Sequence, residues 1–353
     1  MIYNHVELHN VTDVQAIADK PGVRLQRLPD EVRSKLNEVA EGVALCPTSC
    51  EIRWVTDASE TRVTLHSDIH HEFVHVFQGD FFHSEVALNP GETREIVLSR
   101  NNELPRLLAE NRIKTAFDTG VWRLRLSGTG RVHFVSIDAG DSAVRPPRAH
   151  EKPALRWIAY GSSITHGFSA SRLANPYIIQ AARRLGVDVV NLGFGGSCHA
   201  EPAMADYLAA RDDWDIVTCE LGINLVENRL PLAEVAERFA YLARTLTKSQ
   251  PNNRPNRKAV LITAFPCKND LYASDDPSRI RLNALRDAVR AAHAACEPDT
   301  TTLLEGFDLL PEWIGLTTDL VHPSDYGMSV IGNHLAAKLQ PVLPIPASAG
   351  TPS

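Results

Sequence analysis

The stretch that decides the fold of the second half of the chain reads LRWIAYGSSITHG, residues 155–167. Residues 155–160 form a short apolar run of the kind found in buried strands. The next residues place two serines between Gly161 and Gly167. Because glycine permits a tight backbone path, a serine in such a turn can expose its hydroxyl group. The stretch therefore predicts a strand followed by a sharp turn that presents a serine.

The residues after this turn alternate between strand-like and helix-like segments. We expect strands at 155–160, 187–191, 215–221, 259–265 and 301–304, and helices at 177–185, 230–247, 280–295 and 326–339. Such alternation is typical of a parallel sheet covered by helices on both faces. In sheets of this kind the ligand lies beyond the carboxyl ends of the strands. The second half is thus predicted to be an α/β domain with its chemistry at that edge.

The first half follows a different pattern, in which apolar and polar residues alternate. Short strands are predicted at 23–28, 51–55, 62–66, 72–77, 94–98, 121–126 and 131–137. Alternation predicts one buried face and one face in water. Many short strands with turn signals between them favour an antiparallel sandwich or jelly roll.

The two patterns meet at a proline-containing linker, residues 139–153. The predicted organisation is a jelly-roll-like β-sandwich accessory domain over residues 1–148, a catalytic domain over 149–345 and a loose tail over 346–353. A length of 353 residues agrees with about two domains.

Composition narrows the class of partner. The formal net charge is −7, which argues against nucleic acid and anionic membranes as main partners. No apolar run reaches the roughly 18 residues of a membrane helix, and the first residues lack the features of a secretory signal. We therefore expect a cytoplasmic protein, in which Cys46 and Cys50 are free thiols more readily than a local disulfide.

Four segments of the second half carry candidate chemistry. The first, residues 160–167, presents the two serines, and the second, residues 191–197, is rich in glycine. The third, residues 220–224, ends in an asparagine whose amide could donate to an oxyanion. The fourth, residues 318–323, holds an aspartate three positions before a histidine. Each segment alone is a weak signal, but their order along the chain is informative.

Together the four segments resemble the SGNH hydrolases, the GDSL-type esterase and lipase superfamily, over about residues 155–340. Ser163 stands at the nucleophile position of the Gly-x-Ser-x-x-x-Gly block, and Gly196 at the glycine of the second block. Asn224 matches the Gly-x-Asn position, and Asp319 and His322 match the Asp-x-x-His pair. The resemblance implies a flavodoxin-like, three-layer αβα domain with a parallel sheet.

Two positions depart from the family pattern. Ser162 stands where the family usually has aspartate, and Leu225 follows Asn224 where aspartate is frequent. Neither position is that of the nucleophile or its base. Ser162 nevertheless leaves open which serine attacks, and the spacing from Gly161 and Gly167 favours Ser163.

The resemblance also implies a mechanism. A serine hydroxyl needs a base to take its proton, and His322 would serve, with Asp319 fixing its tautomer. The backbone N–H groups of Ser163 and Gly196 and the side chain of Asn224 would form the oxyanion hole. We expect no metal and no other cofactor.

Simpler interpretations remain for these residues. Ser163 could cap the next segment, Asn224 could form a turn, His322 could be a surface residue, and Gly193 or Gly195 could replace Gly196. A group of histidines also suggests a metal site, although polar residues on a strand face explain it better: His66, His70, His71 and His75. Two further histidines, His166 and His199, are either cleft residues or ordinary loop residues.

The combination of a jelly-roll-like module and an SGNH domain resembles carbohydrate acetyl esterases and a smaller branch of acyltransferases. Hydrolysis of short acyl esters, acetyl above all, on a sugar is the leading hypothesis. Acyl transfer to a small-molecule alcohol and a non-catalytic sugar-binding protein are the alternatives. The expected partner is a small-molecule or oligosaccharide ester, and the accessory domain could also serve contacts in a homo-oligomer.

Overall fold

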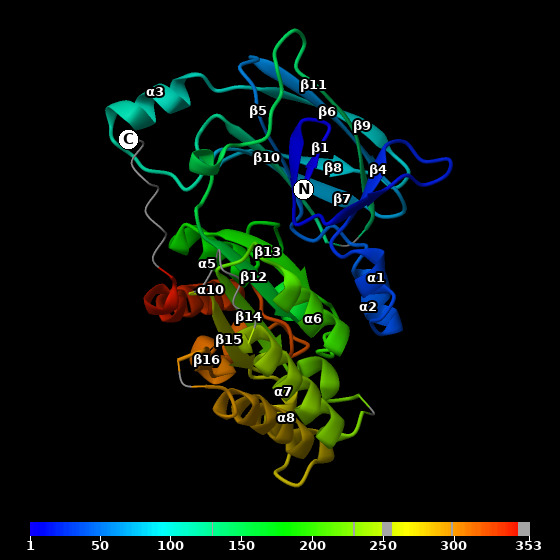
Figure 1. Ribbon diagram of the computed structural model, residues 1–353, viewed down its shortest axis with the longest axis vertical. Helices are drawn as coiled ribbons and strands as arrows, with labels where there is room; N and C mark the ends of the chain where they lie inside the picture. The colour runs from blue at the N-terminus through cyan, green and yellow to red at the C-terminus, as the bar shows by residue number, and fades with distance from the viewer. Residues whose placement is uncertain (129, 229, 249–255, 298, 345–353) are drawn as a thin grey trace.

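The computed structural model describes residues 1–344 apart from residues 129, 229, 249–255 and 298. A β domain lies over an α/β domain, and the chain passes from one to the other once, after β11 (Figure 1). The last strand of the β domain ends at Asp138 and the first strand of the α/β domain begins at Arg156, so the predicted linker lies between them. The predicted tail, residues 346–353, lies outside the described residues.

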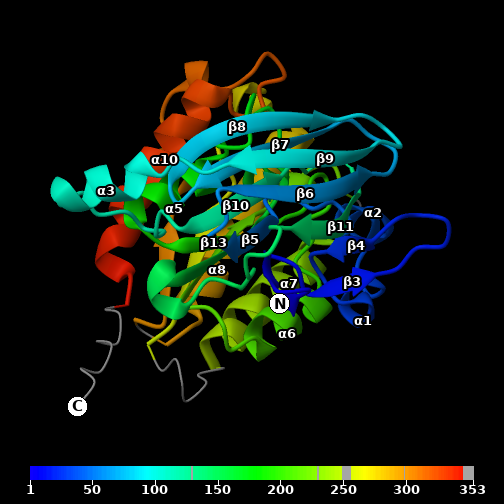
Figure 2. The same ribbon diagram turned by 90° about the horizontal axis from the view of Figure 1, so that it is seen from above.

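Two antiparallel sheets form the β domain, as the alternating pattern predicted. The inner sheet has the order β1-β2-β5-β10-β7-β8, with bounds Ile2–Tyr3, Val6–His9, Glu51–Val55, Val121–Leu126, Glu72–Gln78 and Phe81–Leu88. The outer sheet has the order β3-β4-β11-β6-β9, with bounds Asp13–Gln15, Val23–Gln26, Val132–Asp138, Glu60–Ser67 and Thr93–Ser99. Apolar side chains of both sheets form a common core that includes Trp54, Leu65, Leu124 and Phe134. Figure 2 shows these strands from above.

The prediction of a water-facing side holds for the outer sheet and is wrong for the inner one. Along β9 exposed and buried residues alternate. Along β5 and β10 every residue is buried. The polar side of the inner sheet is covered by the α/β domain, so its charged residues are enclosed between the two domains. A pattern of alternation reports polarity and cannot reveal a second domain that covers the polar face.

The α/β domain contains a five-stranded parallel sheet of the order β13-β12-β14-β15-β16. The strands are Asp188–Gly193, Arg156–Gly161, Ile216–Leu221, Lys258–Thr263 and Thr301–Leu304. Helices α5 (Tyr177–Leu185) and α10 (Asp325–Leu339) cover one face, and α6 (Pro202–Ala210), α7 (Leu232–Lys248) and α8 (Pro277–Ala294) cover the other. The strand order and the three layers confirm the predicted flavodoxin-like fold.

Several shorter elements complete the fold. They are the helices α1 (Asp30–Arg33), α2 (Glu38–Val43), α3 (Glu103–Glu110), α4 (Ser163–His166) and α9 (Gly306–Leu309) and the 3₁₀ turns Ala149–Glu151, Ile223–Leu225, Lys268–Leu271, Trp313–Gly315 and Gln340–Val342. In the described part of the chain, no helix is long and apolar enough to cross a membrane. All six cysteines are free, including Cys46 and Cys50, as predicted.

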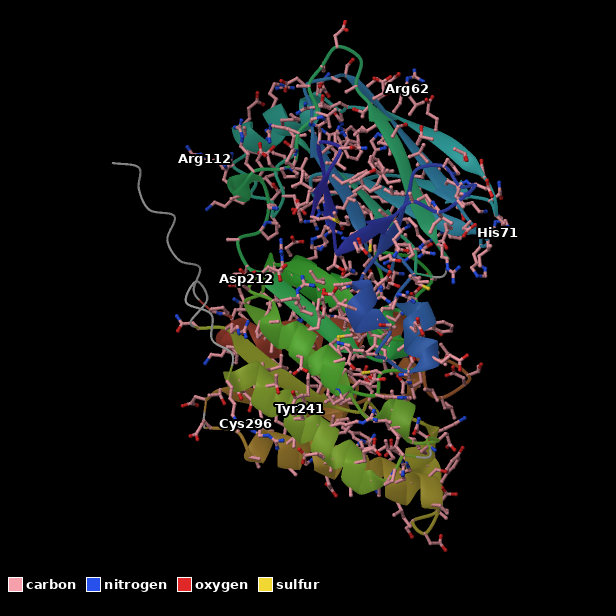
Figure 3. All side chains as sticks on the ribbon, turned by 45° about the vertical axis from the view of Figure 1, so that its right-hand side comes forward. Arg62, His71, Arg112, Asp212, Tyr241 and Cys296 are labelled. Carbon is pink, nitrogen blue, oxygen red and sulfur yellow. The ribbon has the colours of Figure 1, made fainter. Side chains whose placement is uncertain are left out.

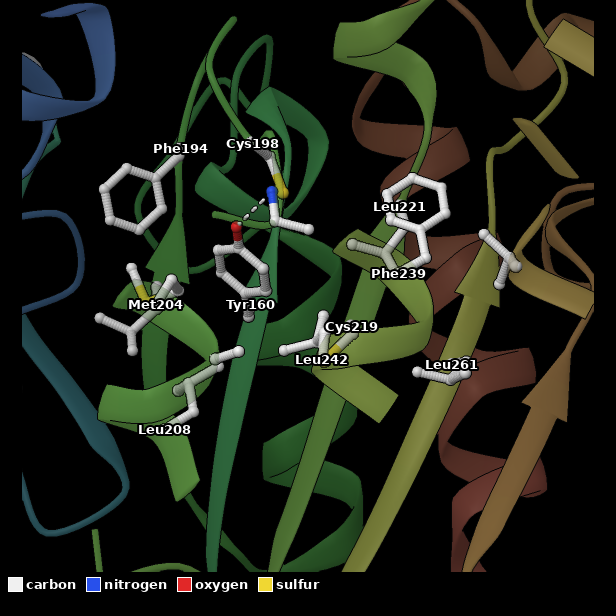
Figure 4. Packing of buried hydrophobic residues seen from close by; sticks show 14 of the residues in the cluster. Tyr160, Phe194, Cys198, Met204, Leu208, Cys219, Leu221, Phe239, Leu242 and Leu261 are labelled. Atoms are coloured by element: carbon white, nitrogen blue, oxygen red, sulfur yellow. Dashed lines mark hydrogen bonds between the residues drawn. The ribbon is translucent and has the colours of Figure 1, made fainter. Parts of the chain in front are cut away.

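One core cluster lies between the sheet and α6, α7 and α8 (Figure 4). Tyr160 and Phe194 meet edge to face at 6.1 Å between ring centroids, and the Tyr160 hydroxyl accepts a hydrogen bond from the backbone N–H of Ala200 at 3.1 Å. Phe239 and Leu242 of α7 complete the contact. Burial of each such apolar side chain contributes about 1.5–3 kcal/mol. The packing fixes the strand that ends at Gly161.

A segment of the β domain also enters this core. Leu28, Ala40 and Ala44 pack with the α/β residues, and α1 and α2 lie beside α6 (Figure 1). These two helices were not predicted, because each is too short for a helical period to stand out. This segment of the β domain therefore belongs to the apolar core of the α/β domain, while the two β sheets keep a core of their own.

The edge strand β13 explains a second part of the domain contact. Its outward carbonyl groups would otherwise remain without partners, which is unfavourable for a covered sheet edge. The carbonyl of Val189 accepts from His9 Nε2 at 2.7 Å, and that of Asn191 accepts from Asn10 Nδ2 at 3.0 Å. Arg27 Nη1 donates to the carbonyls of Asn191 and Gly193 at 3.1 and 3.0 Å. Side chains of the β domain thus take the place of a neighbouring strand.

Candidate active site

The turn after β12 places Ser163 at the start of α4. A Cβ atom at Gly161 would lie 2.3 Å from Thr165 Oγ1 and 2.8 Å from Glu220 Oε2, so only glycine fits there. Ser163 lines a pocket of about 570 Å³, and its Oγ lies 2.8 Å from His322 Nε2. The serine that the sequence favoured is therefore the one in contact with the histidine.

The loop before α10 holds His322 and Asp319. Its ends are joined by a bridge between Leu316 and Pro323, and Leu320 adopts a left-handed conformation with φ of 54°. Asp319 Oδ2 lies 2.6 Å from His322 Nδ1. The loop thus presents the imidazole with one nitrogen toward the serine and the other toward the carboxylate.

The second oxygen of Asp319 is also engaged. It accepts hydrogen bonds from the backbone N–H groups of Val321 and His322 at 2.8 and 2.9 Å and from the Thr317 hydroxyl at 2.9 Å. Partial burial works to raise the pKa of Asp319, but these bonds and the one from the His322 ring outweigh it and lower the pKa. Asp319 is therefore held as a carboxylate.

Asn224 and two glycines of the second segment, Gly195 and Gly196, line the same pocket. Asn224 Oδ1 accepts a hydrogen bond from the backbone N–H of Cys198 at 3.0 Å, which fixes the orientation of the amide. Gly196 has a φ of 70°, and Gly195 lies beside Ser163. Gly193, the third candidate, packs against the backbone of His166 and does not line the pocket.

Ser162 occupies a separate environment below the turn. Its hydroxyl donates to Glu220 Oε2 at 2.6 Å and accepts from the backbone N–H of Ile164 at 3.1 Å. The side chain of Ser162 therefore caps α4, and its hydrogen-bond partners in the described chain are Glu220 and Ile164, not His322.

Glu220 is a residue that the motifs did not single out. Burial raises its pKa, and hydrogen bonds from Ser162 and Thr165 oppose that effect. Its Oε2 accepts from the backbone N–H of Ser162 at 2.8 Å and from the Thr165 hydroxyl at 3.2 Å. A signal was present in the sequence, because a carboxylate at the end of the apolar run of β14 calls for a buried partner.

The β domain forms part of the pocket wall through Val43, Cys46 and Gly128. His166 joins this wall to α4, since its Nε2 lies 2.8 Å from Thr48 Oγ1 and 2.9 Å from the Gly128 carbonyl. Burial, and then the charge of Arg27, lower the pKa of His166 to about 4, so the imidazole is neutral at neutral pH. His166 therefore lines the cleft, which decides one of the two open interpretations of this residue.

The other histidines have different surroundings. His199 does not line the pocket and lies 3.4 Å from Asn228 Nδ2. His66 Nδ1 contacts the Thr93 hydroxyl at 3.0 Å, and His75 Nε2 contacts Glu85 at 2.7 Å. Across the described residues, no group of three or more His, Cys, Asp or Glu side chains is arranged to hold a metal ion.

The arrangement of Ser163, His322 and Asp319 can carry a proton from a hydroxyl to an imidazole whose charge the carboxylate then stabilises. Asn224, Gly195 and Gly196 line the same pocket as Ser163 and His322. Such a set of groups suits acyl transfer from an ester to serine.

Comparison with known families agrees with this geometry. Residues 159–330 match the model of the GDSL-like Lipase/Acylhydrolase family. The α/β domain is therefore a GDSL-type, or SGNH, hydrolase domain, and the resemblance drawn from the four segments is confirmed. A search of curated proteins finds no match for the chain.

Solved structures share the two-domain architecture at low sequence identity, so they support the fold alone. The salicylyl-acyltransferase SsfX3 from a tetracycline biosynthetic pathway has a TM-score of 0.77 at 16% identity, covering 96% of both chains. A family two carbohydrate esterase from Clostridium thermocellum, solved with cellohexaose, has a TM-score of 0.57 at 14% identity over 83% of this chain and 92% of its own. An acetyl xylan esterase from Butyrivibrio proteoclasticus has a TM-score of 0.57 at 12% identity over 97% and 96%.

Proposed function

We propose that the protein is a serine esterase that hydrolyses short-chain acyl esters, acetyl esters above all, on carbohydrates. The observation that carries the proposal is the chain of contacts from Ser163 Oγ to His322 Nε2 at 2.8 Å and from His322 Nδ1 to Asp319 at 2.6 Å, opening on a pocket. The family match of the α/β domain supports the same chemistry.

In the proposed reaction His322 takes the proton of Ser163 while Oγ attacks the ester carbonyl carbon. The tetrahedral intermediate collapses, the C–O bond to the alcohol breaks, and His322 returns the proton to the leaving oxygen. Water then attacks the acyl-enzyme with the same histidine as base, which releases the acid and restores the serine. Asp319 stabilises the imidazolium in both halves.

The backbone N–H groups of Ser163 and Gly196 and the side-chain amide of Asn224 are the proposed oxyanion donors. The hydrogen bond from Cys198 to Asn224 Oδ1 supports this role, because it leaves the amide nitrogen as the free end of the side chain. No step of this scheme uses a metal or an organic cofactor.

A sugar ester is the proposed substrate because two exposed charged side chains, Glu227 and Lys268, are among the residues that line the pocket. The walls formed by Val43 and Cys46 of the β domain limit the space beside Ser163. Structural neighbours that carry the names of carbohydrate esterases support the choice by fold alone.

The test compares Ser163→Ala with Ser162→Ala as a matched control. Hydrolysis of an aryl acetate and of a panel of acetylated saccharides is measured for both variants and for the unaltered protein. We expect Ser163→Ala to lose turnover of every ester and Ser162→Ala to retain it. Full activity of Ser163→Ala would refute the proposal.

Acyl transfer to an alcohol other than water is the second candidate, and a specific feature favours it. A further hollow of about 380 Å³ adjoins the first and shares Gly128, His166 and Phe168 with it. Apolar rings, Phe73 and Phe168, line this hollow and are largely exposed, which suits an acceptor molecule. Product analysis with candidate alcohols separates the two reactions, since transfer gives a new ester and hydrolysis gives the free acid.

A non-catalytic sugar-binding protein is the remaining alternative. A serine-directed organophosphonate should label Ser163 if the esterase proposal holds, because labelling requires an activated hydroxyl. An intact protein that does not react would favour the binding role.

A further inference from the structure

A third pocket, of about 630 Å³, lies between the inner sheet of the β domain and the start of β13 and α5. It is remote from Ser163. Because β12 and β13 run parallel, with Arg156 opposite Asp188 and Gly161 opposite Gly193, Asp188 in the pocket wall and Ser163 lie at opposite ends of the sheet. The proposed esterase chemistry makes no use of this pocket.

The pocket wall is built around one buried carboxylate, Glu51. Three arginines from the inner sheet surround it, and all have at most 7% of their surface exposed: Arg53, Arg123 and Arg125. Arg123 donates to both carboxylate oxygens at 2.8 and 2.9 Å, Arg53 Nε donates to one at 2.7 Å, and Arg125 Nε donates to the other at 2.8 Å. The acceptor capacity of Glu51 is therefore fully used.

The three arginines differ in what else they contact. Nη1 and Nη2 of Arg53 donate to the two carboxylate oxygens of Asp188, at 2.8 and 2.7 Å. Arg123 Nη1 has only long contacts, 3.3 Å to the Gly79 carbonyl and 3.5 Å to Asp80. Arg125 has Glu51 as its only hydrogen-bond partner among the described residues. Arg125 and Arg123 thus carry donor groups into the pocket that no protein acceptor fully satisfies.

The charge of the pocket lining is positive. Arg183 and Arg184 of α5 stand at its exposed rim, so five arginines face three carboxylates, namely Glu51, Asp80 and Asp188. Asp80 is itself occupied by the backbone N–H groups of Ala116 and Phe117, at 2.6 and 3.1 Å. Burial lowers the pKa of Arg125 although Glu51 lies beside it, which agrees with a guanidinium short of negative partners.

Apolar rings bound the rest of the space. Phe117 lies under the guanidinium of Arg123, with 3.7 Å between the Cζ atom and the ring centroid, and Phe77 lies 5.2 Å from that of Arg125. These contacts hold the arginines in place and leave a partly apolar wall beside them. Interiors are normally close-packed, so an ion network that served only to join the domains would not need a space of this size.

We propose that this interdomain pocket binds a small anionic molecule that carries a carboxylate or phosphate group. The anionic group would accept hydrogen bonds from Arg123 and Arg125, and the remainder would lie between Phe77, Phe117 and the rim of α5. The volume is that of a typical small-molecule site. The planar donor edges of arginine suit both groups, and they would neutralise the excess charge.

The test measures binding to the full chain by calorimetry, with inorganic phosphate and glucuronate as separate probes and chloride at equal ionic strength as reference. The Ser163→Ala variant is measured as well, so that the result does not depend on esterase chemistry. We expect saturable binding of at least one probe, with equal affinity in both proteins. A preference for phosphate or for glucuronate identifies the anionic group.

Matched variants assign the binding to the pocket. Arg125→Gln should weaken it about 10- to 100-fold, the usual cost of a lost hydrogen bond to a charged group, and leave aryl acetate hydrolysis unchanged. Arg62→Gln is the control, because Arg62 lies on the outer sheet, away from the α/β domain (Figure 3). If Arg125→Gln does not fold, weaker binding by the exposed-rim variant Arg183→Gln decides in favour. No saturable binding of either probe, or binding unaltered by the pocket variants, overturns the proposal.

Discussion

The proposed catalytic pocket at Ser163 and the arginine pocket both lie where the two domains meet, yet they are built in opposite ways. The first collects residues from loops that follow strands of one sheet: Ser163 after β12, Gly196 after β13, Asn224 after β14 and His322 before α10. The second collects alternate residues from inside strands, such as Arg53 of β5 and Arg125 of β10, and joins them to Asp188 at the start of a strand in the other domain. Groups at strand ends can reach a substrate, whereas groups inside strands of a covered sheet first have to satisfy one another.

The two pockets also differ in their electrostatics. Asp319 is about half exposed and keeps its charge through nearby N–H and O–H donors. Glu51 and Asp188 are buried, and desolvation would raise the pKa of both, but the adjacent arginines outweigh it and lower them. Loss of a partner should therefore reduce activity in the first pocket and stability in the second.

The largest expected effect is that of Ser163→Ala on the proposed hydrolysis. Loss of the nucleophile in a serine hydrolase costs on the order of 10⁶-fold in kcat. Folding should be nearly unaffected, because within the described residues the Ser163 side chain makes a hydrogen bond only with His322. Steady-state hydrolysis of an aryl acetate and a urea unfolding curve measure the two quantities. Retained turnover would show that Ser163 is not the nucleophile and that the pocket at Ser163 does not act as proposed.

The next effect is expected from Arg53→Met, which leaves Asp188 buried without its bidentate partner. Removal of one member of a buried ion pair typically costs about 3–5 kcal/mol of unfolding free energy. The folded protein should hydrolyse esters at the normal rate, since Arg53 lies at the far end of the sheet from Ser163. Arg62→Met removes exposed ion pairs with Glu60 and Glu95, which water and salt screen, so it should change stability far less than Arg53→Met. If both variants lost the same unfolding free energy, burial of the ion pair would not be what makes Arg53 important for stability.

Asn224→Ala should lower activity and leave stability nearly unchanged, which is the opposite of the effect expected for Arg53→Met. Loss of one oxyanion donor typically lowers kcat about 10²- to 10³-fold. KM and the unfolding midpoint should change little, because the Asn224 side chain accepts a single hydrogen bond from the described residues, that of the Cys198 backbone N–H. A change confined to KM would show that Asn224 binds the substrate ground state and is not an oxyanion donor.

The same differences explain which parts of the fold and of the two pockets could be predicted from the sequence. The strand and helix pattern predicted the parallel sheet, and the four segments predicted which residues meet in the catalytic pocket, since each sits beside a strand end or a helix start. Glu220 was missed because its partners, Ser162 and Thr165, lie in the turn and short helix that follow a different strand, far away in the sequence. The arginine pocket was missed because alternation marks Arg53 and Arg125 as polar, and polar residues in strands normally face water. Contacts between domains do not appear in a local pattern.

Acid should weaken the domain contact, and His9 provides the test. Burial, and then the charge of Arg53, lower the pKa of His9 to about 4, against an opposing effect of Asp188. The unfolded chain binds a proton near pH 6.5 and the folded one near pH 4, so His9 makes stability fall as the pH drops through this window. In His9→Gln, whose amide can still donate to Val189, the slope of unfolding free energy against pH should decrease by about one proton. An unaltered slope between pH 6.5 and 4 would show that His9 is not held neutral.

The smallest effect concerns one of the hydrogen bonds that link the β domain to the serine turn, the bond between Thr48 and His166. Thr48→Val removes the 2.8 Å contact to His166 Nε2 but keeps the shape of the side chain, and His166 retains the Gly128 carbonyl. We expect a loss of about 0.5–1.5 kcal/mol in unfolding free energy. Because α4 is also held by Ser162 and Glu220, kcat should stay within about fivefold, a difference of about 1 kcal/mol. A loss in kcat as large as that of Asn224→Ala would mean that the β domain sets the position of Ser163, and the division between a catalytic pocket and a structural contact would have to be abandoned.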